Sequence, residues 1–214
     1  MNWINKDTEI YCSFAKIAGN TGCQMMNSAF YYHGLNKIYK SFSVDNIEDA
    51  VNSVKTLNIK AFAITMPYKV EVLDYVDEMT DEVKGIGATN TIMNNDGVLK
   101  AYNTDYLSAQ EILVDCVGKD LYILGSGGYS KAVKAAAESL NIKYEFITRN
   151  DWNEIDDIKD SVIYNCTPVE NIKVDESNKF IDCIVTTETG KRLANIQASH
   201  QFKLYTGLEF PYAK

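Results

Sequence analysis

The stretch LYILGSGGYSKAVKAAAESL, residues 121–140, places a predicted strand, a glycine-rich turn and a predicted helix in direct succession. The apolar run from Leu121 to Leu124 has the length of a buried strand, and the residues from about Tyr129 favour a helix. A Gly-x-Gly-Gly turn in this position allows backbone N–H groups at the helix start to bind a pyrophosphate. The stretch therefore predicts a dinucleotide-binding unit, although a tight turn without a ligand has the same pattern.

Arg149, in the segment ITRN after the next predicted strand, bears on the choice of cofactor. In a dinucleotide-binding fold an acidic residue at this place binds the ribose 2′-hydroxyl of NAD, whereas an arginine binds the 2′-phosphate of NADP. A guanidinium group offers a planar set of donors to phosphate. The nearby Asp151 weakens the argument and a solvated loop arginine is the alternative, but the residues favour NADP.

The same alternation of strands and helices continues on both sides of this stretch. Upstream, strands are predicted at 10–14, 37–44 and 61–65, with helices near 25–33, from 47, and after Pro67 at a first helical turn. Asp96-Gly97 between two β-prone runs predicts a hairpin. Downstream, a helix from Asp105 precedes the strand at 121–124, and strands follow near 143–149, 161–168 and 180–185.

We predict an α/β fold with two domains. An α/β substrate and catalytic domain covers 1–104, and a Rossmann-like NADP-binding domain covers 105–189. A C-terminal helix over 190–214 packs back on the first domain.

Composition excludes several classes of protein. The chain of 214 residues has 21 Lys and Arg against 29 Asp and Glu, a formal charge of −8, and its lysines are scattered, which argues against a nucleic-acid or membrane surface. No signal peptide and no run of about 18 apolar residues is present, so a cytoplasmic protein is predicted. Five Cys without a CxxC pattern indicate reduced thiols, and no metal-binding motif occurs. The expected partner is a small-molecule substrate, and the protein is expected to be a monomer or homodimer.

Lys69 ends the segment ITMPYK, residues 64–69, which closes the apolar run from Ala61. The helix dipole disfavours a cation at a helix start, so a lysine after Pro67 indicates a functional reason. Asn90 and Asp105 follow predicted strand or hairpin ends in the same half, and a lysine, an amide and a carboxylate can act together on a hydroxyl-bearing substrate. A surface lysine is the alternative, and spacing alone leaves both open.

Six segments occur in the order found in the shikimate dehydrogenase family, which the chain resembles from about residue 59 to residue 168. They are ITMPYK, GIGATNTI, YNTD, GSGGYSKA, ITRN and NCTPVE. The N-terminal GN and NSAF and the C-terminal IQASHQFKLYTG are similar to the ends of the family. The resemblance implies a two-domain α/β enzyme that uses NADPH to reduce 3-dehydroshikimate to shikimate.

The resemblance also implies roles for individual residues. Lys69 and Asp105 match the catalytic pair, and Thr65, Asn90 and Gln197 match substrate-binding positions. For the cofactor, the resemblance implies that Gly125, Gly127 and Gly128 hold the pyrophosphate and that Arg149 binds the 2′-phosphate. The adjoining predicted positions are Ser126, Tyr129, Thr148 and Thr167.

The chain departs from the family where the substrate carboxylate is bound. The family has a Ser-x-Ser pair there, whereas this chain has a shorter segment, TGCQMM, which offers Thr21, Cys23, Gln24 and backbone N–H groups instead. Thr21 and Gln24 are the predicted replacements. Val185 or Thr186 stands where the family has Tyr, and the segment before Gln197 is shortened. The substrate can therefore be a related cyclic hydroxy acid. A non-catalytic small-molecule binding module of the same fold and a different oxidoreductase chemistry are the alternatives.

Overall fold

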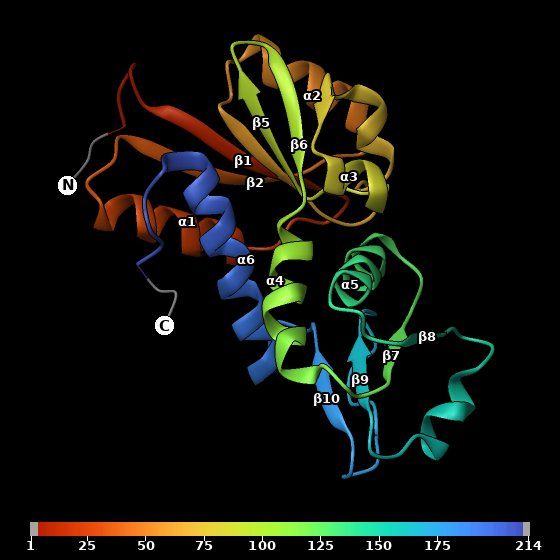
Figure 1. The fold of residues 1–214 in the computed structure, drawn as a ribbon. Coiled ribbons are helices and arrows are strands. Elements are labelled where there is room, and N and C mark those ends of the chain that lie inside the picture. The colour runs from red at the N-terminus through yellow and green to blue at the C-terminus, as the bar shows by residue number, and fades with distance from the viewer. Residues whose placement is uncertain (1–3, 212–214) are drawn as a thin grey trace. The chain divides into compact units, whose positions relative to one another are not determined.

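The computed structural model describes residues 4–211, which form two compact units (Figure 1). The first unit comprises the residues up to Thr104 and the segment from Ala198 onwards, and the second comprises Asp105–Gln197. Residues 1–3 and 212–214, the outermost parts of the predicted ranges 1–104 and 190–214, lie outside the described residues. The assignment of substrate binding to the first unit and NADP binding to the second stays a prediction.

The first unit is built on a six-stranded sheet in the order β2-β1-β3-β5-β6-β4. The three strands β1 (Glu9–Ala15), β2 (Lys37–Ser43) and β3 (Ala61–Ile64) are parallel. β5 (Thr91–Asn95) and β6 (Val98–Tyr102) form an antiparallel hairpin beside β3, and the short β4 (Glu78–Met79) closes the edge. Asp96 and Gly97 have φ values of 51° and 96°, which confirms the predicted Asp-Gly turn.

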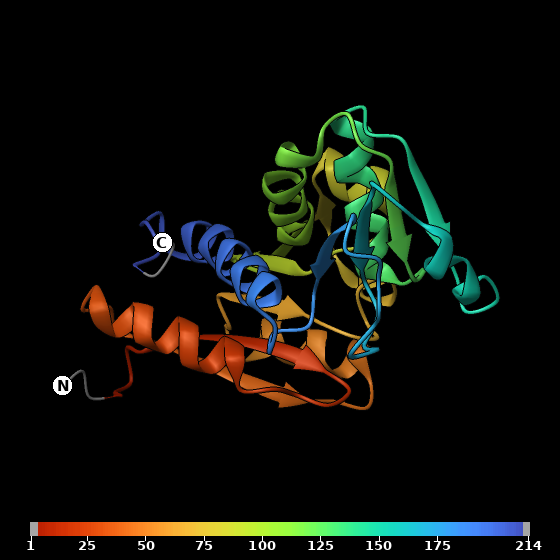
Figure 2. The same ribbon diagram turned by 90° about the horizontal axis from the view of Figure 1, so that it is seen from below.

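Helices cover both faces of this sheet (Figures 1 and 2). Strand residues alternate between faces, so Phe14 and Phe62 pack against α2 (Ile47–Thr56), η1 (Glu71–Tyr75) and α3 (Asp81–Ile86). On the other face, Tyr11 and Tyr39 pack against α1 (Thr21–Tyr32) and the C-terminal part of α6 (Glu188–Thr206).

Two predicted helix boundaries near the sheet edge are wrong. α1 begins at Thr21 rather than near Met25, so TGCQMM is helical. Gly22 lies in its first turn close to Tyr39, where an added Cβ would lie a tight 3.2 Å from a ring carbon. No α-helix starts at Pro67: residues 66–70 form a turn, and the next helical element is η1. Within this turn Tyr68 is buried, and its hydroxyl donates to the Val44 carbonyl at 2.7 Å.

The second unit contains a four-stranded parallel sheet in the order β10-β9-β7-β8. Its strands are β7 (Leu121–Leu124), β8 (Tyr144–Ile147), β9 (Val162–Asn165) and β10 (Lys179–Asp182). One face packs against α4 (Thr104–Leu113), η2 (Val114–Cys116), α5 (Gly128–Ser139) and the first half of α6, and the other against η3 (Trp152–Asp157). The predicted α/β class with a Rossmann-like unit is confirmed.

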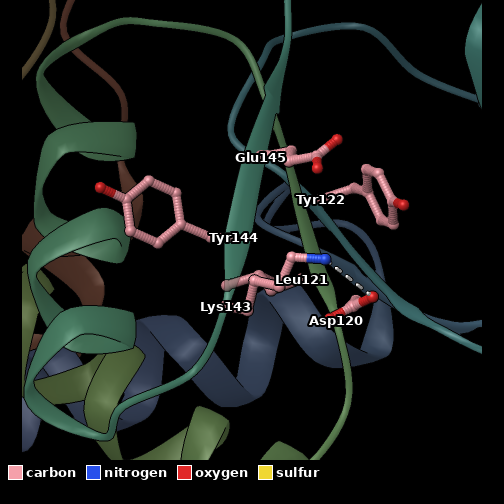
Figure 3. Close-up of a pocket in the computed structure, with 6 residues that line it drawn as sticks. All are labelled: Asp120, Leu121, Tyr122, Lys143, Tyr144 and Glu145. Atoms are coloured by element: carbon pink, nitrogen blue, oxygen red, sulfur yellow. Dashed lines mark ion pairs between the residues drawn. The ribbon is translucent and has the colours of Figure 1, made fainter.

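Strand β8 forms one edge of this sheet (Figure 3). Tyr122 and Glu145 are paired in register and project from the same face, whereas Tyr144 projects from the opposite face. The Tyr144 hydroxyl donates to the carboxylate of Glu138 in α5 at 2.8 Å. The alternation along β8 therefore directs one face of the sheet edge toward α5 and the other away from it.

Asn94 ties the hairpin to the connection before β3, and its removal should destabilise the protein. Its side chain is 8% exposed, donates to the Ile59 carbonyl at 2.9 Å and accepts from the Gly97 N–H at 2.8 Å. Asn94→Ala leaves both backbone groups without these partners, so we expect the free energy of unfolding to fall by about 1–3 kcal/mol.

Urea denaturation checks this as a lower midpoint with an unchanged slope. Asn95→Ala, at the exposed neighbouring position, is the matched control and should shift the midpoint little. Equal shifts in the two variants would contradict the assignment.

Candidate active site

The turn after β3 is bonded at both ends to the segment GATNT. The Ile64 N–H donates to the Asn90 carbonyl at 2.9 Å, and the Thr89 N–H donates to the Lys69 carbonyl at 2.8 Å. The Thr65 N–H donates to the Phe14 carbonyl at 3.0 Å and continues the pairing with β1. Lys69 is partly exposed and Thr65 is exposed. The structure therefore brings three predicted residues, Thr65, Lys69 and Asn90, to the C-terminal end of β3.

The side chain of Asn90 is held by buried hydrogen bonds. It is 1% exposed, and its Oδ1 accepts from the Thr104 N–H at 2.8 Å and from the Thr91 hydroxyl at 3.0 Å. Its Nδ2 donates to the Thr104 hydroxyl at 2.9 Å. Gln201 Nε2 donates to the Thr91 hydroxyl at 2.9 Å and so extends the network into α6. A buried amide with several partners has one orientation, which presents a fixed polar surface at this strand end.

The sequence analysis missed Thr104 and Gln201 as members of this network. Thr104 stands directly before Asp105 in YNTD, and Gln201 follows Gln197 by one helical turn, so their positions carried a signal. Gln197 itself is partly exposed and belongs to the second unit. Its predicted contact with substrate stays a prediction.

Asp105 lies in the first turn of α4, where the helix dipole favours a carboxylate. Its side chain is 3% exposed, and its carbonyl accepts from the Ser108 hydroxyl at 3.0 Å. Asp105 belongs to the second unit and Lys69 to the first. Their action as a pair stays a prediction, which mutation can test.

Thr21 and Gln24 lie exposed on the first turn of α1, beside a cluster that the sequence analysis did not identify. Cys23 Sγ lies 3.2 Å from the Ser41 hydroxyl, which also accepts from the Ser13 hydroxyl at 3.0 Å. Ser13 and Ser41 are both 8% exposed near the C-terminal ends of β1 and β2. Two hydroxyls and a thiol thus supply polar hydrogens close to the segment that lacks Ser-x-Ser.

In the second unit, the strand order reverses between β7 and β9, which is where open α/β sheets bind ligands. Gly125 follows β7 and has a φ of 95°, and Thr167 lies two residues after the end of β9. A Cβ on Gly125 would lie 2.7 Å from Thr167 Cγ2, so this approach also requires glycine.

Helix α5 begins at Gly128 directly after this turn. Its N-cap is Gly127, which has no side chain to cap the helix, and Ser126 in the turn is exposed. The N–H groups of a first helical turn, with the positive end of the helix dipole, fit a pyrophosphate. The predicted Gly125, Ser126, Gly127 and Gly128 therefore form an arrangement that suits a dinucleotide.

Tyr129 contributes to this site differently from its neighbours. Its hydroxyl lies 2.9 Å from the hydroxyl of Tyr164, which is fully buried in β9. Burial is the main cause that raises the pKa of both phenols well above the ordinary value of 10.0, so both stay protonated at neutral pH. The Tyr129 side chain is thus part of the core of the second unit. Only the backbone of Tyr129 belongs to the first turn of α5 that is considered for pyrophosphate.

Thr148 and Arg149 follow β8, next to β7. The Thr148 hydroxyl donates to the carboxylate of Asp151 at 2.6 Å, which closes a local turn. Asp151, the residue that weakened the NADP argument, is therefore engaged by Thr148, while the Arg149 side chain is exposed. Phosphate binding at Arg149 stays a prediction.

Three other features of the described residues bear on where a ligand could bind. Within residues 4–211, no group of three or more His, Cys, Asp or Glu side chains could hold a metal ion. No helix in that range is long and apolar enough to cross a membrane. A groove beside β7 and β8 is lined by the carboxylates of Asp120, Glu145, Glu154 and Asp157, and their charge disfavours phosphate.

Comparison with known proteins relates the chain to one family. Residues 15–92 match the shikimate dehydrogenase substrate binding domain. A shikimate dehydrogenase-like protein from Haemophilus influenzae is 36% identical over 151 residues, which cover 69% of this chain and 56% of the relative. The shikimate dehydrogenase (NADP(+)) of Caldanaerobacter subterraneus subsp. tengcongensis is 33% identical over 174 residues, which cover 77% of this chain and 62% of the relative.

A solved shikimate dehydrogenase in complex with NADP+ is 27% identical, with a TM-score of 0.76 over 97% of this chain and 93% of that chain. The chain matches less than two thirds of the length of the two curated relatives.

Gly125→Ala should destabilise the second unit. A left-handed backbone conformation costs a residue with a Cβ about 1–2 kcal/mol, and the Thr167 methyl adds a steric clash, so the thermal midpoint should fall. Gly127→Ala is the matched control, because its φ is −80° and nothing lies within 4 Å of an added Cβ.

The double variant Gly125→Ala/Thr167→Ser, which lacks the clashing methyl, should recover part of the loss. A Gly125→Ala protein as stable as Gly127→Ala would contradict the predicted strain.

Proposed function

Because the chain belongs to the shikimate dehydrogenase family, we propose that it is an NADP-dependent oxidoreductase that reduces 3-dehydroshikimate to shikimate or acts on a closely related cyclic hydroxy acid. The observation that carries the proposal is the bonding of ITMPYK to GATNT, which gathers Lys69, Thr65 and Asn90 at one strand end. The glycine turn at the reversal point of the second sheet supports a dinucleotide as the second reactant. A cytoplasmic, monomeric or homodimeric protein is part of this proposal.

Backbone N–H groups of Gly127, Gly128 and Tyr129 would hold the pyrophosphate of NADP, and Arg149 its 2′-phosphate. When bound, the cofactor supplies the hydride that reduces the substrate carbonyl.

Lys69 supplies the proton that the reduced carbonyl oxygen takes up, and it accepts that proton when the reaction runs in reverse. Asp105 compensates the ammonium charge and orients it. Asn90, Thr65 and Gln197 bind substrate hydroxyls, and the network through Thr104 keeps the Asn90 amide in one orientation.

The substrate carboxylate needs donors, because a carboxylate that leaves water unpaired is costly to bury. Within the linked Ser13, Ser41 and Cys23 group, one hydrogen of Ser41 or Cys23 is left for such a role, and Thr21 and Gln24 lie on the same turn of α1 as Cys23. This set replaces the Ser-x-Ser pair in the proposal. Its different geometry favours a related acid over shikimate itself.

A screen of cyclic hydroxy acids with NADP and NAD tests the proposal, with absorbance of the reduced nicotinamide as the signal. Turnover of any of these acids supports the oxidoreductase. Saturable binding of an acid without turnover would instead support a non-catalytic binding module of the same fold.

Lys69→Ala should lower kcat by roughly 10²–10⁴, the range expected for loss of an acid or base. Cofactor affinity, measured by fluorescence titration, should change little, because the residues proposed to hold the cofactor lie in the second unit. Lys60→Ala, a substitution elsewhere in the first unit, is the control. A Lys69→Ala enzyme with near-normal kcat would exclude Lys69 as the proton donor.

Arg149→Ala should weaken NADP binding while leaving NAD binding nearly unchanged. A charge-assisted contact to phosphate contributes on the order of 1.5–3 kcal/mol, so the ratio of the two affinities should shift by roughly 10- to 100-fold toward NAD. Titration of both cofactors measures it, with Arg192→Ala, the other arginine of the chain, as the control. An unchanged ratio would show that Arg149 does not select the cofactor.

A further inference from the structure

Cys166 and Cys183 occupy neighbouring positions at the ends of two parallel strands. β9 and β10 pair in register, with Tyr164 opposite Ile181 and Asn165 opposite Asp182. Cys166 and Cys183 follow as the next opposite residues. The Cys183 N–H donates to the Asn165 carbonyl at 3.2 Å, so the pairing continues past the last strand residues.

The two cysteines also lie on the same face of the sheet. Residues two apart on a strand share a face, and the pairing continues one residue past β9 and β10, so we infer that Cys166 follows the face of Tyr164 and Cys183 that of Ile181. Tyr164 and Ile181 both pack in the same core cluster. Cys166 packs against this cluster as a partly buried residue.

Strand spacing makes a bond between the two sulfurs feasible. Neighbouring strands lie about 4.7–4.9 Å apart. Disulfides join residues whose Cα atoms are about 4.4–6.8 Å apart. Rotation of the side chains about χ1 can then bring the sulfurs together.

Exposure distinguishes this pair from other cysteines of the chain. Both residues are partly exposed, whereas Cys12 and Cys116 are buried. Cys23, also partly exposed, lies in the first unit. Within the second unit, Cys166 and Cys183 are therefore the thiols that a small oxidant can reach.

The segment that carries Cys166 contacts the glycine turn. The Cys183 thiol donates to the Thr167 carbonyl at 3.8 Å. A Cβ on Gly125 would lie 3.8 Å from the Cys166 carbonyl oxygen and 2.7 Å from Thr167 Cγ2. Cys166 and Thr167 thus form one wall of the turn proposed to hold the pyrophosphate, and a shift of this wall changes the space beside Gly125.

We propose that Cys166 and Cys183 form a redox-active dithiol, and that their oxidation to a disulfide weakens dinucleotide binding at the Gly125 turn. The second half of the proposal rests on the proposed function. The oxidant is a hydroperoxide. One thiolate attacks the peroxide oxygen to give a sulfenic acid and release water or an alcohol, and the second thiol then displaces water and forms the disulfide. The two sulfurs lose two electrons in total, and a reducing dithiol reverses the reaction by exchange.

Treatment of the full chain with hydrogen peroxide, followed by mass spectrometry, tests the dithiol. We expect the intact protein to lose the mass of two hydrogens, a linked peptide pair containing Cys166 and Cys183, and recovery with dithiothreitol. Cys166→Ser and Cys183→Ser should each abolish the link, whereas Cys23→Ser should retain it. Oxygen added to single cysteines without a link, or a link to another cysteine, would overturn the proposal.

Fluorescence titration of NADPH into reduced and oxidised protein tests the consequence. We expect affinity to fall about tenfold on oxidation, equivalent to about 1.4 kcal/mol, and to recover with dithiothreitol. The Cys183→Ser protein should show no such loss under the same treatment. A linked protein with unchanged affinity would overturn the regulatory half. If the reduced protein binds neither NADPH nor NADH, the proposed function fails, while the mass measurement still decides whether the dithiol exists.

Discussion

The buried backbone and side chain of Asn90 fix the geometry on which the first unit depends. The carbonyl accepts from Ile64 at the end of β3, and the side-chain amide bonds to both the N–H and the hydroxyl of Thr104. Because a buried amide is costly when its polar atoms lack partners, these bonds act as a constraint on three chain segments at once. They place the Lys69 turn beside GATNT and fix where the chain leaves the first unit.

A second constraint is the parallel order of the sheet that contains β7. Since β8 lies on one side of β7 and β9 on the other, the turns after β7 and β9 meet at the same edge. Gly125 and Thr167 approach there so closely that a Cβ on Gly125 would clash. This contact therefore connects the turn before α5 to the segment that carries Cys166.

Sequence patterns predicted most elements well, and the exceptions have physical causes. Local backbone preferences explain the Asp96-Gly97 turn and the strand, turn and helix around Gly125. The residue types in these short stretches indicate such preferences directly. At the start of α1 Gly22 lies close to Tyr39, and in the turn at Pro67 the buried Tyr68 bonds to Val44. These contacts join residues far apart in the chain, so local propensity gave the wrong boundary.

The same distinction applies to the candidate site. By itself, the sequence determined that a glycine-rich turn precedes a helix, that an arginine follows the next strand, and that the ordered segments resemble one family, because these are properties of short stretches. Only the tertiary structure decided that Gln201 bonds to Thr91, that Ser13, Ser41 and Cys23 cluster, and that Cys166 lies opposite Cys183. Strand register and helix packing set those distances, and both arise from contacts between segments that no local pattern encodes.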